Sequence, residues 1–325
     1  MKAVLCREHG SPGVLTVEEV PSPPLAAGRV LVRVRACGVN FPDVLMIAGK
    51  YQVQPPLPFS PGAEFAGEII DVGEDCRTSI VGQRVLAITG FGGMAEEASV
   101  TENSLVPIPD DLDYETAAAF LLAYGTSWHA LRQRAELARG ETLLVLGAAG
   151  GVGLAAVQIG KLIGAQVIAA AGTAEKLELA KENGADETIN YTETRLKDAI
   201  RELTAGRGAD VIFDPVGGEL FDDCLRAVAW RGRILIVGFA SGTIQSIPAN
   251  LPLLKGSSLL GVFWGQFTRL EPQLHQQNTA DLLTALVQGH LKPHIGAVFP
   301  LGRAAEALQM LAERRAAGKV VVRVS

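Results

Sequence analysis

A short glycine-rich segment constrains the fold of this chain more than any other feature. It follows the apolar run Leu143-Leu144-Val145-Leu146 and precedes an apolar helical pattern, so it joins a buried strand to a helix. Ala148, Gly150 and Gly153 have the spacing of the dinucleotide fingerprint, with alanine at the first glycine position. Gly150 would let the backbone approach a pyrophosphate, and Gly153 would let the helix pack closely on the strand. The segment predicts a dinucleotide site at a helix N-terminus, against the alternative of a tight turn that binds nothing.

Strand and helix patterns alternate along the chain after this segment. The helical patterns begin at capping residues such as Thr173 and end at glycines such as Gly184. This alternation implies an α/β domain with a parallel, doubly wound sheet. The predicted strands cover residues 143–146, 166–170, 188–190, 211–214, 233–237 and 259–263, and the predicted helices cover 152–163, 174–183, 195–203 and 219–230.

The remaining sequence predicts a second, β-rich domain. Before residue 120, strand-like runs such as 30–34, 68–72 and 83–88 alternate with turns rich in proline and glycine, which suggests a barrel-like or distorted sandwich. An alanine-rich helical pattern over 116–131 could link the two domains. After residue 263, two helical patterns precede a final strand that we expect to return to the first domain. The predicted division is 1–122, 123–263 and a return segment 264–325.

Composition limits the classes of function. The net charge is -6 and no run of lysine or arginine appears, so a nucleic-acid or anionic-membrane surface is not indicated. The N-terminus lacks the apolar core of a signal peptide, and no apolar run reaches the ~20 residues of a membrane helix. The four cysteines are scattered and form no CxxC pair, so we expect a reduced, cytoplasmic protein.

The end of the second strand of the doubly wound sheet indicates the type of dinucleotide. An NAD site usually has Asp or Glu there, but this chain continues as Ala171-Gly172-Thr173 without an acid. A 2′-phosphate would be tolerated at this position, and Lys176 in the next helix could pair with it, although Glu175 lies beside it. Lys176 could equally be an ordinary exposed lysine.

The segments 148–153, 172–176, 184–186 and 190–191 together resemble the NADPH-binding half of zeta-crystallin-like quinone oxidoreductases. The resemblance extends over nearly the whole chain, including 36–43, 61–67, 123–128, 237–239 and 318–321. It implies a GroES-like catalytic domain, a Rossmann domain, an active site in the cleft between them, and a homodimer. It also implies the cofactor-binding residues Asn40, Thr126, Ala149, Gly150, Gly151, Val152, Gly172, Thr173, Lys176, Tyr191, Phe239, Phe263 and Lys319.

The resemblance also predicts a protein without a metal. Zinc-dependent members of the superfamily bind their catalytic metal through cysteine, histidine, and a second cysteine or an aspartate. Asn40 stands where the first cysteine would be, and Ala63 stands where the histidine would be. Cys37 is displaced from the ligand position, and the lobe of four closely spaced cysteines is missing.

Without a Lewis acid to stabilise an alkoxide, hydride transfer to an electron-poor quinone or α,β-unsaturated carbonyl is the easier reaction. Tyr51 is the candidate proton donor, because related 2-enoyl thioester reductases have an acidic tyrosine at the same Gly-x-Tyr spacing; alternatively it only lines the pocket. Asn40 is expected to hydrogen-bond the cofactor or the substrate carbonyl. Asp43 would orient Asn40 or the nicotinamide ribose, or would cap a helix. We expect Glu64 to have a structural role and to hold the turn within residues 61–67.

Three functions remain open at this stage. The first is an NADPH:quinone oxidoreductase acting on a small electron-poor substrate. The second keeps the fold and reduces the double bond of 2-enoyl-CoA or 2-alkenal substrates, with Tyr51 as the acid. The third is an NADPH-binding structural or RNA-binding protein, and the acidic charge balance argues against RNA.

Overall fold

The computed structural model describes residues 1–324, and the chain divides into two compact units. Unit 2 is the continuous segment Ala123–Lys292, whereas unit 1 combines Met1–Leu122 with the chain from Pro293 onward. The first boundary agrees with the predicted one at residue 123. The second differs, because the return segment begins at Pro293 and not at residue 264.

The boundary differs because two helices after residue 263 pack within unit 2. These are α9 (Trp264–Leu270) and α10 (Pro272–Val287). In α9, the Phe267 ring stacks on His129 of unit 2, with 3.9 Å between the ring centroids. Of this region the sequence predicts only a helix over 279–287, which lies within α10, and it does not show which surface the apolar faces of the two helices cover.

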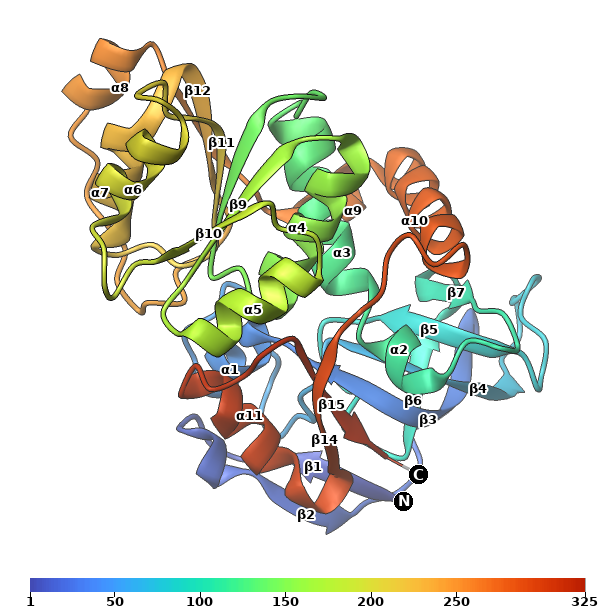
Figure 1. Ribbon diagram of the computed structural model, residues 1–325. Coiled ribbons are helices and arrows are strands. Elements are labelled where there is room, and N and C mark those ends of the chain that lie inside the picture. Colours follow the sequence, from blue (N-terminus) through green and yellow to red (C-terminus); the bar gives the residue numbers. More distant parts are fainter. Residues whose placement is uncertain (325) are drawn as a thin grey trace. The chain divides into compact units, whose positions relative to one another are not determined.

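Unit 2 contains the doubly wound sheet that the sequence predicts. All six strands are parallel, in the order β10-β9-β8-β11-β12-β13, and helices lie on both faces (Figure 1). The strands are β8 (Thr142–Leu146), β9 (Gln166–Ala171), β10 (Glu187–Asn190), β11 (Ala209–Asp214), β12 (Val228–Ile236) and β13 (Ser258–Gly261), and the helices that connect them are α4 (Gly151–Ile163), α5 (Ala174–Glu182), α6 (Leu196–Leu203), α7 (Leu220–Ala227) and α8 (Asn250–Lys255).

Chain order reverses at the centre of this sheet, where β8 is flanked by β9 and β11. Ligands of open α/β sheets bind at such a switch point, outside the carboxyl ends of the strands. The loops that follow β8 and β11 meet there, since a Cβ added at Gly147 would lie 3.1 Å from Val216 Cγ2. The predicted glycine segment therefore lies at the expected ligand-binding end of the sheet.

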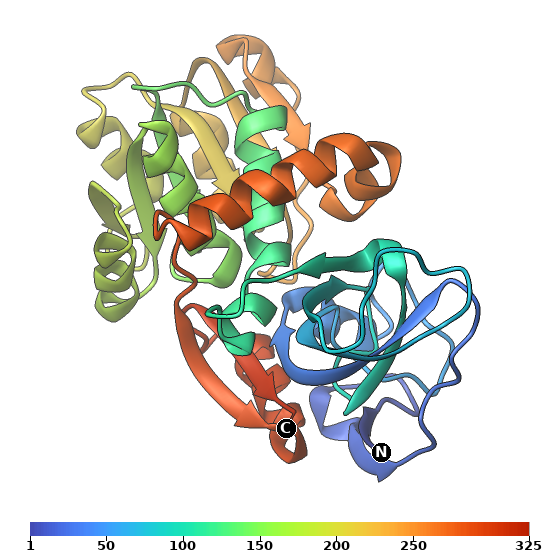
Figure 2. The ribbon, with the colours of Figure 1, turned by 90° about the vertical axis from the view of Figure 1, so that its right-hand side faces the viewer.

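Unit 1 is built on a seven-stranded sheet that curves strongly (Figure 2). Its order is β14-β15-β3-β4-β5-β7, and β6 pairs with β3. The strands are β3 (Arg29–Val39), β4 (Glu64–Val72), β5 (Arg84–Ile88), β6 (Glu97–Thr101), β7 (Leu105–Pro107), β14 (Ile295–Pro300) and β15 (Lys319–Arg323). A separate two-stranded sheet joins β1 (Lys2–Leu5) to β2 (Thr16–Glu19).

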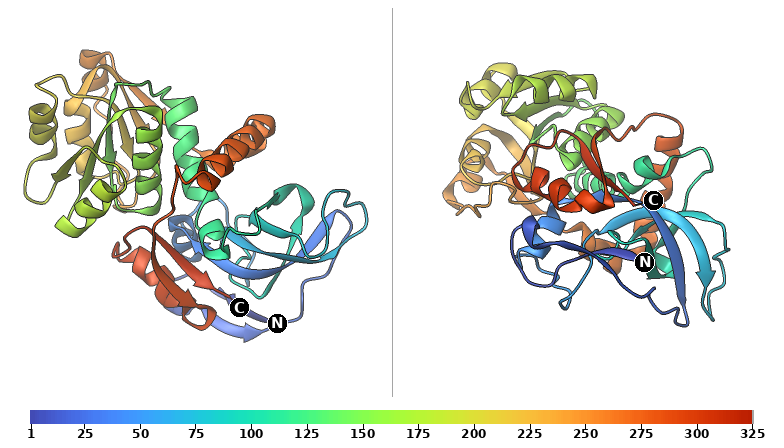
Figure 3. Two further views of the ribbon diagram at one scale, coloured as in Figure 1. Left: turned by 45° about the vertical axis from the view of Figure 1, so that its right-hand side comes forward. Right: turned by 90° about the horizontal axis from the view of Figure 1, so that it is seen from below.

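The C-terminal strand β15 is an interior strand of this sheet. It lies between β3, to which it is antiparallel, and β14, to which it is parallel (Figure 3). The helix α11 (Ala304–Ala312) joins β14 to β15 and packs on α1 (Phe41–Ile47). The predicted return of the final strand to the first domain is confirmed by this pairing.

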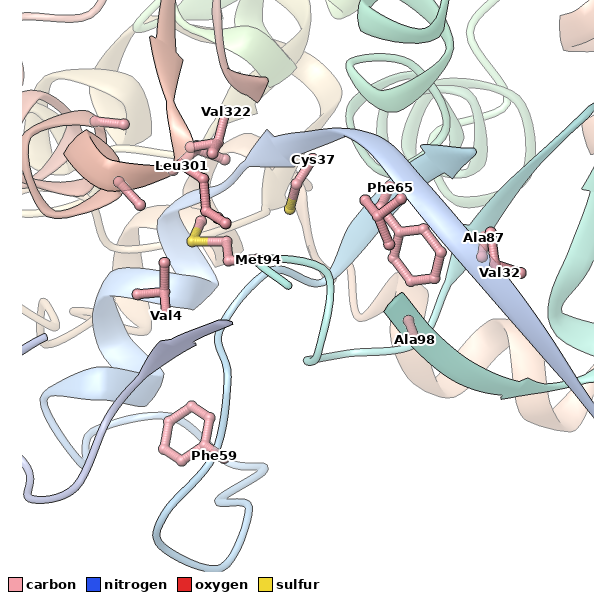
Figure 4. Close-up of a cluster of buried hydrophobic side chains, with 14 of the residues drawn as sticks. Val4, Val32, Cys37, Phe59, Phe65, Ala87, Met94, Ala98, Leu301 and Val322 are labelled. Carbon is pink, nitrogen blue, oxygen red and sulfur yellow. The ribbon is translucent and has the colours of Figure 1, made fainter. Parts of the chain in front are cut away.

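The core of unit 1 draws side chains from both ends of the chain. Val4, Phe65 and Met94 from the N-terminal segment and Leu301 and Val322 from the C-terminal segment belong to one buried apolar cluster (Figure 4). The apolar face of the C-terminal segment therefore completes a core that the first 122 residues begin.

Two predicted helices have different extents in the structure. The helix predicted over 219–230 ends at Ala227, where β12 begins, and the pattern over 116–131 forms α2 (Tyr114–Ala118), α3 (Leu121–Trp128) and the π-helical segment η3 (His129–Arg134). Within residues 1–324, no helix has the length and apolar character needed to cross a membrane.

Candidate functional site

The glycine segment of unit 2 forms a tight turn that leads into α4. Gly147 has a φ of +56°, so the residue that needs the freedom of glycine precedes Ala148, which is fully buried. A Cβ on Gly153 would lie 2.2 Å from Gly147 O, so the helix packs on the turn at a distance that only glycine permits. Alanine at the first position of the fingerprint therefore leaves the turn intact.

The N-terminus of α4 is suited to a pyrophosphate. Gly150 is the N-cap residue in extended conformation, and Gly151 and Val152 form the half-buried first turn. The first amides of a helix have no acceptor within the helix and lie at its positive dipole end. Ala149 is buried in the preceding turn. The four predicted residues 149–152 are thus continuous at one anion-binding terminus.

A second group of predicted residues meets at the carboxyl ends of β9 and β10. A Cβ on Gly172 would lie 3.3 Å from Tyr191 Cε2, so the tyrosine ring lies against the backbone that follows β9. Thr173 caps α5 through its hydroxyl, which accepts a hydrogen bond from Lys176 N (3.4 Å). Lys176 is therefore in the first turn of α5, and the acid of that turn, Glu175, is exposed. The structure brings together the four residues predicted to bind a 2′-phosphate.

The other predicted cofactor residues of unit 2 lie on separate elements. Thr126 belongs to α3, and Phe239 follows β12, with its ring close to Gly217 of the loop after β11. Phe263 follows β13 and is 46% exposed. Their roles in cofactor binding stay predictions.

Asp214 lies at the carboxyl end of β11, beside the switch point. Its Oδ1 accepts hydrogen bonds from the amides of Val216 and Gly217, both at 2.8 Å, whereas Oδ2 is buried without a partner. Burial raises the pKa of this carboxyl. The hydrogen bonds of Oδ1 hold the β11 loop that lies against Gly147.

A buried polar cluster lies in unit 1, where Asn40, Glu64 and Lys319 meet. Lys319 Nζ lies 2.6 Å from Asn40 Oδ1 and 2.6 Å from Glu64 Oε1, and Asn40 Nδ2 donates to the same Glu64 oxygen at 3.0 Å. Asn40 is 7% exposed and Lys319 is 4% exposed. Lys319, predicted to bind the cofactor, forms a buried ion pair with Glu64 in unit 1, and its role toward the cofactor stays a prediction.

Sequence reasoning missed Glu64 as a partner of Asn40 and Lys319. The signal was present, because Glu64 and Lys319 carry opposite charges and are the first residues of two strands. Both strands pair with the same end of β3: Glu64 is opposite Gly38, and Val320 is opposite Val39. Only the register of the sheet places the two charges side by side.

Asp43 holds the backbone around this cluster. Its carboxylate accepts hydrogen bonds from the amides of Asn40 (2.8 Å), Gly62 (3.3 Å) and Ala63 (3.1 Å). Burial raises its pKa to about 7, against the lowering effect of the amide of Asn40 and of the ammonium of Lys319. Its oxygens cap the N-terminus of α1 and hold the turn at residues 62–63. Of the roles considered for Asp43, its position corresponds to that of a helix cap.

Tyr51 follows α1 and is half-buried against the core of unit 1. Burial, and secondarily the charge of Asp43, raises the pKa of its phenol. The hydroxyl therefore keeps its proton at neutral pH and can act as a hydrogen-bond donor. This state is compatible with either predicted role, the acid or the pocket residue.

The positions predicted to replace zinc ligands do not form a donor set. Asn40 uses its carboxamide within the polar cluster, and Ala63 is buried and has no ligating atom. Across the part of the chain that the structure describes, His, Cys, Asp and Glu form no group of three or more that could hold a metal ion.

Known proteins resemble both the sequence and the fold. The family described as "Alcohol dehydrogenase GroES-like domain" matches residues 26–110, and the family described as "Zinc-binding dehydrogenase" matches residues 151–279. Quinone oxidoreductase-like protein 2 homolog of Nematostella vectensis is 43% identical over 324 residues, which are 99% of this chain and 88% of that protein. Human quinone oxidoreductase is 36% identical over 309 residues, 94% of this chain and 92% of that protein.

Solved structures of similar proteins cover the whole chain. Escherichia coli quinone oxidoreductase complexed with NADPH superimposes with a TM-score of 0.93 at 27% identity, covering all of both chains. A mycobacterial protein complexed with NADPH gives a TM-score of 0.94 at 33% identity, also over the full length of both. The chain therefore belongs to the quinone oxidoreductase family of the medium-chain dehydrogenase/reductase superfamily, oxidoreductases that combine a GroES-like domain with a Rossmann domain.

Proposed function

We propose that this chain is an NADPH-dependent, zinc-independent quinone reductase. NADPH as the cofactor is supported by a cluster of four residues at the ends of β9 and β10, namely Gly172, Thr173, Lys176 and Tyr191. No acid stands at the end of β9. A 2′-phosphate would meet a cation and two hydroxyl groups there. The quinone acceptor rests on the names of the relatives and on the electron-poor substrates that hydride transfer favours.

Tyr51 is the candidate partner of the acceptor. Bound NADPH supplies a hydride, and the protonated hydroxyl of Tyr51 would donate a hydrogen bond or a proton to the acceptor oxygen. Burial of Tyr51 keeps that proton in place, because it raises the pKa of the phenol.

The proposed independence from zinc rests on charge as well as on missing ligands. The ammonium of Lys319 lies 2.6 Å from Asn40 Oδ1, at the position where zinc-dependent relatives have their first ligand. A divalent cation at this position would be repelled by the buried lysine. Addition of zinc or of a chelator to the purified protein should leave its turnover unchanged, and loss of turnover with the chelator would contradict this part of the proposal.

The acceptor is tested by NADPH oxidation with a simple quinone, a 2-alkenal and a 2-enoyl-CoA compared side by side, each with the wild type and Tyr51→Phe. Quinone turnover that survives the substitution supports a quinone reductase with Tyr51 as a pocket residue. The protonated Tyr51 also favours a second candidate, a double-bond reductase, and rapid alkenal or enoyl turnover that collapses with Tyr51→Phe would select it. Absence of turnover with all three acceptors would contradict both.

We also propose that the protein is a homodimer. β13 is an edge of the unit 2 sheet, and an open parallel edge is a site for pairing with another chain. Exposed apolar side chains lie on α8 and on the adjacent strand β12, namely Trp230, Leu253 and Leu254. Sedimentation analysis should give twice the chain mass, and the double variant Leu253→Asp/Leu254→Asp should shift the protein toward the monomer. A wild type that sediments as a monomer at all concentrations would contradict the dimer.

A further inference from the structure

The carboxamide of Asn40 has no proton left to offer a ligand. One Nδ2 proton is directed to Gly38 O (3.2 Å) and the other to Glu64 Oε1 (3.0 Å). Its Oδ1 accepts from Lys319 Nζ at 2.6 Å and keeps a second lone pair. Asn40 in this arrangement can accept a further hydrogen bond but cannot donate one.

Glu64 and Lys319 fix this orientation from two other strands. Glu64 is anchored at both oxygens, since Oε2 accepts the amide of Leu122 (2.9 Å) while Oε1 faces Asn40 and Lys319. Gly38 makes the approach possible, because a Cβ there would lie 2.8 Å from Glu64 Oε1. Reversing the amide would place its NH₂ group against the ammonium and its oxygen against the carboxylate.

We infer that Lys319 is a positioning residue that holds the Asn40 carboxamide as an acceptor-only group. The inference rests on the proposed function and assigns the ligand groups within it. Asn40 can accept an N–H or O–H donor of a ligand, and it does not donate to the carbonyl oxygen of the substrate. Tyr51 is then the side chain that we propose to donate a hydrogen bond or a proton to the carbonyl oxygen.

The first test asks whether Asn40 must accept or donate. In Asn40→Asp/Glu64→Gln the acceptor and the net charge of the cluster are both kept, whereas Asn40→Leu removes the acceptor. We expect the double variant to retain kcat/KM for NADPH within about tenfold of the wild type, and Asn40→Leu to lose about 100-fold. If the double variant is as inactive as Asn40→Leu although both are folded, Asn40 acts as a donor and the inference is wrong.

The second test asks whether Lys319 acts through Asn40. Lys319→Met/Glu64→Gln removes the cation without leaving a buried carboxylate unpaired, and should lower kcat/KM about tenfold. In the Asn40→Leu background the same pair of substitutions should change kcat/KM by less than about twofold. Equal losses in both backgrounds would show that Lys319 contacts the ligand independently and would overturn its positioning role.

A third measurement does not depend on turnover. In the ¹⁵N-labelled wild type, the side-chain NH₂ signals of Asn40, assigned by their absence in Asn40→Leu, should exchange with solvent at least about tenfold more slowly than those of exposed asparagines. Exchange as fast as an exposed amide would contradict the fixed orientation. Because no acceptor is added, this result stands even if the protein reduces neither quinones nor alkenals.

Discussion

At Asp43, burial and hydrogen bonding act on one carboxylate in opposite directions. Three backbone amides stabilise its charge, yet burial raises its pKa from the usual 3.8 to about 7. A folded-state pKa above the unfolded value means that the folded protein holds the proton more tightly. The stability contributed by this group is complete below about pH 4 and is lost as the pH rises to about 7.

The variant Asp43→Asn should remove this pH dependence. The rise from 3.8 to about 7 corresponds to about 4 kcal/mol, so the free energy of unfolding of the wild type should fall by up to that amount across the window. Asp43→Asn will be less stable near pH 4, because its NH₂ group cannot accept the amide of Asn40, but its profile should be flatter. Urea denaturation at several pH values measures both, and parallel profiles would show that Asp43 is charged throughout.

Lys176 is expected to distinguish the two nicotinamide cofactors. Lys176→Met removes the cation proposed to pair with the 2′-phosphate, so KM for NADPH should rise about tenfold while KM for NADH stays within about twofold. Lys181→Met, at an exposed position of the same helix, is the matched control. Equal effects on both cofactors would show that Lys176 supports the fold or the pyrophosphate and does not select the phosphate.

At the scale of single residues, sequence alone located the residues of local motifs but did not predict the contacts that form across strands. The glycine segment and Lys176 are each defined by their neighbours in the chain. Lys319 was predicted to bind the cofactor because the resemblance included its strand, and the contacts of its ammonium with Asn40 and Glu64 were not predicted. Such a pairing depends on strand register, which short-range patterns do not contain.

At the level of elements, the turn between β8 and α4 contains glycines with two different roles, close packing of the backbone and space for the predicted pyrophosphate. Gly153 is required for packing, since its Cβ would lie 2.2 Å from a backbone oxygen that cannot move aside. Gly150 has an ordinary φ of −79°, and its Cβ would meet Gly147 O at 3.3 Å, a tight contact but a much smaller overlap than at Gly153, so alanine should cost less here. The same Cβ would occupy the side from which the predicted pyrophosphate approaches.

Alanine substitutions at the two positions should therefore have different effects. Gly153→Ala should lower the free energy of unfolding by about 2 kcal/mol or more, because backbone must shift. Gly150→Ala should lower it by less than about 1 kcal/mol and weaken NADPH binding about tenfold. Thermal unfolding and fluorescence titration give the two quantities, and loss of stability in Gly150→Ala comparable to that in Gly153→Ala would contradict the distinction.

The elements that sequence predicted well are those buried on both faces. The strands of the doubly wound sheet appear within a few residues of their predicted bounds, because continuous apolar runs between glycines have few other solutions. β14 was not predicted, since it contains Gly296 and ends at Pro300, and both residue types are uncommon in strands. The helix over 219–230 was extended too far because Val228 and Ala229 fit either a helix or the strand that they form.

At the level of the whole molecule, the chain order makes unit 1 dependent on its last residues. Unit 2 is continuous from Ala123 to Lys292, and unit 1 is closed by β14, α11 and β15, which follow it. β15 supplies both an interior strand of the unit 1 sheet and Lys319 of the polar cluster. Folding of unit 1 therefore requires contacts between residues at opposite ends of the sequence, which are slow to form.

A chain that stops after Lys292 should keep one unit and lose the other. Without β15, β3 has an unpaired edge, Glu64 is a buried carboxylate without its lysine, and Leu301 and Val322 leave the core. We expect hydrogen exchange of residues 1–122 to approach that of an unfolded chain, while β8 to β12 stay protected and NADPH still protects the α4 N-terminus. The full-length chain is the control, and a synthetic peptide of residues 293–325 should restore protection of unit 1. Protection of residues 1–122 in the shortened chain without the peptide would mean that the first segment folds by itself. The C-terminal strand would then not be required for the fold of unit 1.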